Sequence, residues 1–135
     1  ILADKEGKPH QLIFFCHGGG WMMANRWATE GIICQYALKT NSVVTYINYR
    51  LSPEYHHPTA EHDCYDCLMV VFPLSYNAQF MMEHHEEYHF DLNKIVLMGD
   101  SAGGQICLSI VRSAREQFNR CLFTKLVTSD PECSK

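Results

Sequence analysis

A serine flanked by small residues constrains this chain more than any other feature. Residues 99–104 are G-D-S-A-G-G, so Ser101 lies in a G-x-S-x-G pattern that directly follows an apolar run at residues 95–98. This pattern is typical of a sharp turn from a strand into a helix, with the serine hydroxyl exposed at the turn. Small neighbours are needed there because a strained turn leaves little room for side chains. We therefore expect a strand to end near Gly99 and a helix to start at Ala102.

A second glycine motif lies upstream, where residues 17–21 are H-G-G-G-W. Because Gly18, Gly19 and Gly20 carry no side chains, their backbone N–H groups could approach a substrate oxygen closely. With the N–H of Ala102 they would form an oxyanion hole beside the serine. Each motif alone is a weak signal, but the two in this order indicate acyl transfer by a nucleophilic serine. We expect His17 to orient the glycine loop rather than to act as a base.

Apolar and β-branched runs alternate with helical patterns along the chain. Strands are expected at residues 12–16, 42–48 and 95–98. Helices are expected at residues 29–39, 59–72, within 77–89, and at 102–118. Strands separated by helices favour right-handed crossovers, and hence an α/β fold with a parallel sheet covered on both faces.

Composition narrows the function classes. With 135 residues, of which 47% are hydrophobic, the chain is large enough for one globular domain. A net charge of −4, with the Lys and Arg residues scattered, argues against a nucleic-acid partner. No apolar run approaches the roughly 20 residues of a membrane span. The 7 cysteines show no repeating spacing, so we expect thiols rather than a disulfide framework.

The chain resembles the hormone-sensitive-lipase-like branch of the α/β-hydrolases, near arylacetamide deacetylases and related carboxylesterases. Three blocks carry the resemblance: residues 17–21, residues 48–54 with Pro58 and Asp63 following, and residues 99–104. It covers about residues 9–118 of a partial α/β-hydrolase domain spanning 1–135, with a divergent tail at 119–135.

This resemblance implies hydrolysis of a carboxylic ester or aryl amide through an acyl-enzyme on Ser101. The substrate would be a small-molecule or lipid ester, no metal or organic cofactor is implied, and the family occurs in the cytoplasm or the endoplasmic reticulum. In this fold the triad runs serine, acid, histidine along the chain. All 8 histidines precede Ser101, and no family-like acid follows it.

Two interpretations follow from the missing base and acid. The chain, which starts at Ile1, is either part of a longer active esterase or a catalytically inactive fragment or binding-only relative. We favour the first. Arg50, with Glu54, Glu61 and Asp63 nearby, is expected to form a structural ion-pair hub.

A zinc site is a minor alternative. Residues 85–89 are H-E-E-Y-H, which on a helix would place His85 and His89 one turn apart. No further histidine follows them, Glu116 is the one well-placed helical carboxylate, and the resemblance puts this segment on a solvated connector. We therefore expect no metal. Cys64 and Cys67 are expected to be thiols on a helix face.

The resemblance also predicts the strand order. The strand at residues 12–16 would be central, flanked by those at 42–48 and 95–98. Both flanking strands would then lack outer neighbours, and unpaired apolar edges are templates for association. We expect the isolated chain to aggregate or to depend on chaperones.

Overall fold

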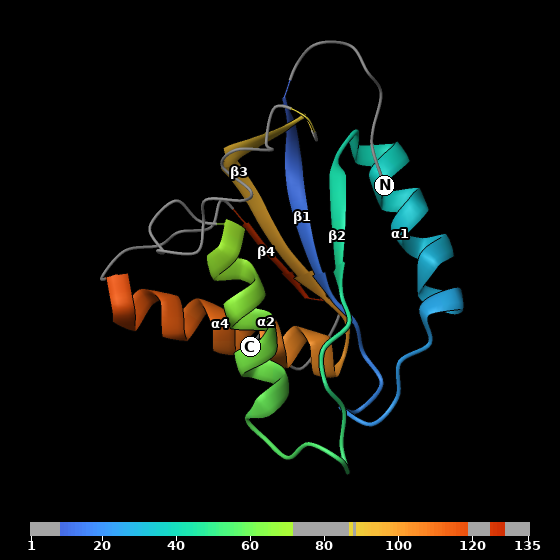
Figure 1. The fold of residues 1–135 in the computed structure, drawn as a ribbon. Coiled ribbons are helices and arrows are strands. Elements are labelled where there is room, and N and C mark those ends of the chain that lie inside the picture. Colours follow the sequence, from blue (N-terminus) through green and yellow to red (C-terminus); the bar gives the residue numbers. More distant parts are fainter. Residues whose placement is uncertain (1–8, 72–86, 88, 119–124, 129–135) are drawn as a thin grey trace.

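Strands and helices alternate throughout the computed structural model, which describes residues 9–71, 87, 89–118 and 125–128 (Figure 1). In chain order the elements are β1 (His10–Cys16), α1 (Arg26–Thr40), β2 (Val43–Ile47), α2 (Thr59–Val71), β3 (Phe90–Gly99), α4 (Ala102–Phe118) and β4 (Lys125–Thr128). The predicted α/β class is confirmed. Within the described part of the chain, no helix is both long and apolar enough to cross a membrane.

The observed elements extend the predicted ones at their ends. Helix α1 begins at Arg26, earlier than predicted, because the Asn25 side chain caps it by accepting a hydrogen bond from the Ala28 N–H at 3.1 Å. Strand β3 begins at Phe90, which pairs with His10 at the start of β1. Nearly all of the helix predicted within residues 77–89 lies outside the described residues.

The sheet has the order β2-β1-β3-β4, and every pairing is parallel. Strand β1 is central, as predicted, and Cys16 at its end pairs with Ile47 on one side and Gly99 on the other. Because parallel strands end at the same edge of a sheet, the residues after β1 and β3 meet there. This register brings both glycine motifs to one place.

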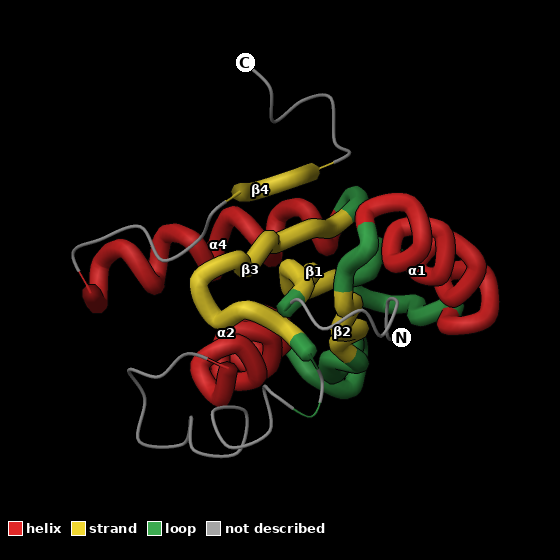
Figure 2. The backbone as a smooth tube through the Cα atoms, turned by 90° about the horizontal axis from the view of Figure 1, so that it is seen from above, coloured by secondary structure: helices red, strands yellow, loops and turns green. Residues whose placement is uncertain are grey.

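Helices cover both faces of the sheet (Figure 2). Alternate side chains of β1 point to opposite faces: Leu12 and Phe14 pack with α2 and α4, whereas Ile13 and Phe15 pack with α1. All four are buried. Strand β1 is thus apolar from Leu12 to Cys16, because both of its faces lie in the core there.

The prediction that both flanking strands lack outer neighbours is wrong for β3. Strand β4 pairs with β3 from Val96–Lys125 to Gly99–Thr128. A strand of four residues is too short for a hydrophobic pattern to show in the sequence. The outer edge of β2 has no partner among the described strands.

Helix α2 allows a test of the core. Leu68 is fully buried, whereas Leu38 on α1 is 76% exposed. Leu68→Ala should lower the free energy of unfolding by about 2–5 kcal/mol, since it removes apolar contacts and leaves a cavity. Leu38→Ala should change it by less than about 0.5 kcal/mol. Urea denaturation measures both, and equal effects would contradict the described packing.

Candidate functional site

Ser101 occupies the turn between β3 and α4 in a left-handed backbone conformation, with φ of 50°. This conformation is uncommon for a residue with a side chain and stores strain. Hydrogen bonds from Gly103 N to the Asp100 carbonyl (2.8 Å) and from Gly104 N to the Ser101 carbonyl (2.9 Å) close the first turn that follows. Ser101 itself is exposed. The sequence-predicted turn is therefore present, with its serine accessible.

The glycines around Ser101 allow backbone to touch backbone. A Cβ on Gly103 would lie 2.0 Å from the carbonyl oxygen of Cys16, at the end of β1. A Cβ on Gly99 would lie 2.5 Å from the Gly103 carbonyl oxygen. Real Cβ atoms do not approach so closely, so any larger residue would push α4 away from the sheet. The position of Ser101 depends on this close approach.

The glycine loop after β1 is joined directly to the serine turn. The Gly18 N–H donates to the Asp100 Oδ1 atom at 3.0 Å. Gly19 and Gly20 have φ values of 117° and 61°, which suit glycine. Their N–H groups donate no hydrogen bond to the residues that the structure describes. The first N–H of the loop is therefore engaged with the serine turn, whereas the next two have no acceptor among the described residues.

His17 lies buried beneath this loop and stacks on two tyrosine rings. Its ring centroid is 4.1 Å from that of Tyr49 and 5.3 Å from that of Tyr46. Nδ1 lies 2.6 Å from the Gly18 carbonyl oxygen, which can only accept, so Nδ1 carries the proton. The Tyr49 hydroxyl donates to the His17 carbonyl at 2.5 Å. The sequence analysis assigned no role to Tyr46, Tyr49 or Asp100, although Tyr49 and Asp100 lie in its motif blocks. Their contacts with the glycine loop depend on β1 lying between β2 and β3.

The imidazole of His17 is held in its neutral form. Burial lowers its pKa, and this outweighs the Gly18 carbonyl and the Asp100 charge, both of which favour the protonated form. Its Nε2 atom is buried and has no hydrogen-bond partner among the described residues. A neutral, stacked ring suits a role in holding the loop.

Arg50 ties the segment after β2 to helix α2. Its guanidinium makes a bidentate contact with Asp63, and the Asp63 carboxylate also accepts the Arg50 backbone N–H at 3.0 Å. The hydrogen bonds to Arg50 hold the pKa of Asp63 below its ordinary value. The predicted ion pair with Asp63 is confirmed, but Glu61 pairs instead with His57, its Oε1 atom lying 3.3 Å from the His57 Nδ1.

The alternative zinc site, His85 with His89, falls partly outside the described residues. His85 lies outside the described residues, and His89 is exposed, with its carbonyl accepting the His10 N–H at 2.8 Å. Among the residues placed by the structure, no group of three or more His, Cys, Asp or Glu side chains could hold a metal ion. The described cysteines are free thiols, among them Cys64 and Cys67.

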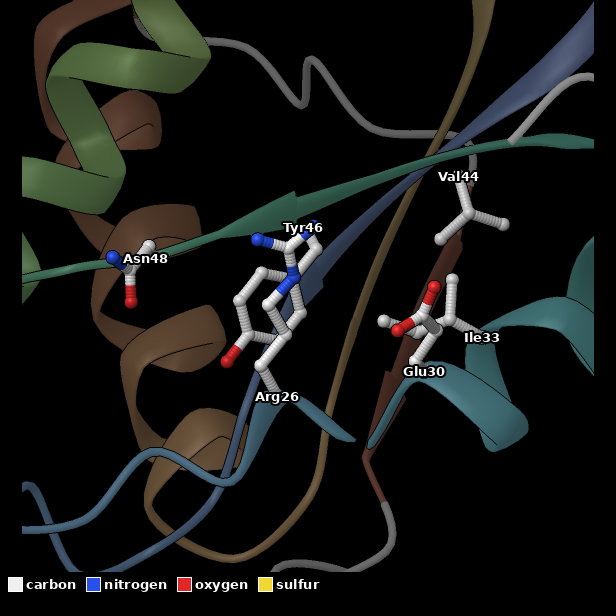
Figure 3. A pocket seen from close by; sticks show the side chains of 6 residues that line it. All are labelled: Arg26, Glu30, Ile33, Val44, Tyr46 and Asn48. Atoms are coloured by element: carbon white, nitrogen blue, oxygen red, sulfur yellow. The ribbon is translucent and has the colours of Figure 1, made fainter. Parts of the chain in front are cut away.

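A hollow of about 440 Å³ lies between α1 and the β2 segment (Figure 3). It is lined by Arg26, Glu30, Ile33, Val44, Tyr46 and Asn48. Burial raises the pKa of Tyr46, although the charge of Arg26 acts to lower it. Ser101 does not line this hollow, so the hollow does not by itself form a site for chemistry at Ser101.

Comparison with known proteins places these features in a family context. The sequence profile of the alpha/beta hydrolase fold family matches residues 13–131 of this chain. A putative alpha/beta hydrolase of Acanthamoeba polyphaga mimivirus is 32% identical over 118 residues, covering 87% of this chain and 31% of that protein. Arylacetamide deacetylase of Bos taurus is 30% identical over 118 residues, covering 86% of this chain and 28% of that protein.

A solved structure has a similar fold. One from an analysis of two fungal esterases of Rhizomucor miehei superposes with a TM-score of 0.75 at 28% identity, covering 93% of this chain and 36% of that one. The chain thus spans about a third of the length of the proteins that it matches.

The close approach at Gly103 predicts a large and local effect. Gly103→Ala should lower the free energy of unfolding by about 1–3 kcal/mol or more, because the new Cβ meets the Cys16 carbonyl. Gly31→Ala is the matched control: Gly31 lies in α1 with nothing near its Cβ position, so alanine should stabilise by about 0.5–1 kcal/mol. Chemical denaturation distinguishes the two, and a neutral Gly103→Ala would refute the described packing.

Proposed function

Because the chain belongs to the α/β hydrolase fold family and has esterase relatives, we propose that it is the nucleophile-bearing part of a carboxylesterase. Ser101 is the nucleophile in this proposal. The observation that carries it is the left-handed conformation of an exposed Ser101 at the strand-to-helix turn, beside a glycine loop with open N–H groups. The substrate is a carboxylic ester of a small molecule or lipid, or an aryl amide.

The proposed reaction proceeds in two steps. The Ser101 Oγ atom attacks the carbonyl carbon while its proton passes to a base, and the carbonyl oxygen becomes an oxyanion. The bond to the leaving alcohol then breaks, the alcohol takes up the proton, and an acyl-enzyme remains. Water attacks the acyl-enzyme in the same manner and releases the acid.

The oxyanion is assigned to three backbone donors, the N–H groups of Gly19, Gly20 and Ala102. Gly18 was expected to be a fourth, but its N–H is engaged by Asp100, and we assign it to holding the loop in place. The start of α4 adds its partial positive charge at the same point. One such donor is typically worth about 2.7–4 kcal/mol in the transition state. His17, neutral and stacked, is assigned to orienting the loop.

The base and its acid are placed outside residues 1–135 in this proposal. In this fold they follow the nucleophile in the order acid, then histidine, whereas all 8 histidines here precede Ser101. His17 is not a candidate for the base, since it is buried and stacked against two tyrosine rings. No metal or organic cofactor enters the reaction.

Ser101→Ala tests the assignment of the nucleophile. In the complete enzyme that carries this chain, the substitution should abolish turnover of a short-chain ester and covalent labelling by a fluorophosphonate probe. Ser113→Ala is the matched control, because Ser113 is an exposed serine on the same helix. Labelling that survives in Ser101→Ala, or disappears in Ser113→Ala, would refute the assignment.

Residues 1–135 alone should hydrolyse esters very slowly. Without base and acid, a serine site retains only the effects of the oxyanion hole and of binding. In enzymes whose triad has been removed, these effects give a rate enhancement of about 10³–10⁴ over the reaction in water. The measurement is p-nitrophenyl acetate hydrolysis by the purified chain, with Ser101→Ala as the blank. Rapid, Ser101-dependent multiple turnover would show that an internal histidine acts as the base.

A further inference from the structure

The segment that follows β2 holds both ends of the glycine loop. At one end the Tyr49 hydroxyl donates to the His17 carbonyl at 2.5 Å. At the other end the Ser52 N–H donates to the Trp21 carbonyl at 2.8 Å. Both donors belong to the sequence block at residues 48–54, which the proposed reaction does not use. This block therefore lies against the loop that is assigned to the oxyanion.

A loop carbonyl that is held in place fixes the direction of the N–H in the same peptide group. A peptide group is planar and almost always trans, so its C=O and N–H point to opposite sides. The His17 carbonyl accepts from Tyr49, and the N–H of the same peptide, that of Gly18, donates to Asp100 at 3.0 Å. Contacts on both sides thus set the plane of the first peptide of the loop.

The next two peptides of the loop are oriented in the same way. The Gly18 carbonyl lies 2.6 Å from His17 Nδ1. The Gly19 carbonyl accepts both N–H groups of residues 22–23, at 3.1 and 3.0 Å. The N–H groups of Gly19 and Gly20 share these two peptides, so they point away from the groups that hold the carbonyls. The direction of both proposed oxyanion donors is therefore set by the partners of the loop carbonyls.

Tyr49 acts on these contacts through its hydroxyl. Both Tyr46 and Tyr49 stack on the His17 ring, but the Tyr46 hydroxyl is buried without a hydrogen-bond partner among the described residues. Tyr49 is buried too, and burial raises the pKa of its hydroxyl, which therefore remains protonated and able to donate. The two tyrosines differ in whether the hydroxyl holds the loop.

Asp63 holds the backbone next to Tyr49. Its carboxylate accepts the Arg50 N–H at 3.0 Å and also contacts the Arg50 guanidinium. Because Asp63 lies on α2, which packs on the sheet, these bonds tie the start of the segment to a fixed element. Asp63 thus reaches the glycine loop through the backbone of Arg50 and Tyr49.

We propose that Tyr49 and Asp63 are positioning residues for the oxyanion donors of Gly19 and Gly20. This inference rests on the proposed function. The substrate oxygen gains its negative charge in the transition state, so a misdirected donor lowers kcat rather than raising KM. A misplacement of about 1 Å can cost about 10²-fold in rate. Tyr49 exerts this effect through His17, without touching the substrate.

The test compares Tyr49→Phe with Tyr46→Phe in the complete enzyme that carries this chain. Tyr49→Phe should lower kcat for p-nitrophenyl acetate about tenfold or more, with KM nearly unchanged. Tyr46→Phe keeps a ring against His17 and removes a hydroxyl that holds nothing, so kcat should stay nearly unchanged. Asp63→Ala should lower kcat in the same direction as Tyr49→Phe. Asp66→Ala is its control, because Asp66 is exposed on the same helix.

Amide hydrogen exchange of residues 17–21 adds a measurement that needs no reactive serine. Exchange at Gly18 should be faster in Tyr49→Phe than in Tyr46→Phe, because its peptide is then held only from the Asp100 side. Urea denaturation of each variant establishes that the protein is folded under the assay conditions.

The proposal is overturned by unchanged kcat in Tyr49→Phe, by an equal loss of kcat in Tyr46→Phe, or by a rise in KM with kcat unchanged. If Tyr49→Phe does not fold, unchanged kcat in Asp63→Ala overturns it. Failure of the nucleophile assignment is recognised separately, because fluorophosphonate labelling then survives in Ser101→Ala. Hydrogen exchange at Gly18 still reports on the role of Tyr49 in that case.

Discussion

The direct contact between the backbone of α4 and the end of β1 is the constraint on which the site depends. Hydrogen atoms at Gly99 and Gly103 take the place of Cβ atoms that would overlap backbone carbonyls. This lets α4 begin directly at the sheet edge, with Ser101 forced into a left-handed turn above it. Strain at that residue is sustained because the surrounding packing leaves no alternative position. The serine is exposed as a consequence of how tightly its neighbours pack.

The buried central strand β1 also fixes the position of the glycine loop. Strand β1 pairs on both sides, so the position of His17 after it is fixed by two neighbouring strands. Stacking on Tyr49 and the hydrogen bond from its hydroxyl then hold the backbone of His17 from the β2 side. The bond between Gly18 and Asp100 holds the loop from the β3 side. The two open N–H groups thus lie on a loop anchored to both flanking strands.

Much of the fold could be predicted from sequence, because β1, β2 and β3 each contain a short apolar or β-branched run and two of the turns carry distinctive glycines. Strand β4 could not, since four residues show no period and its existence depends on pairing with β3. The three glycines of the loop are equivalent in the sequence, and only the structure distinguishes Gly18, whose N–H meets Asp100. Tyr49 lies in the block at residues 48–54, but its contact with His17 depends on the pairing of β1 with β2. The partner of Glu61 was assigned to Arg50 from proximity in sequence, whereas in the structure His57, in the turn just before α2, contacts it.

The hydrogen bond from Gly18 to Asp100 joins residues that are 82 positions apart. Contacts of this range form only after the chain has closed a long loop, and the entropy of closure is lost before any pairing energy is gained. Strands β1 and β3 are parallel and meet the same kinetic obstacle, whereas α1 and α4 can form locally. We therefore expect the geometry that exposes Ser101 to form late in folding, with the apolar strands exposed until then.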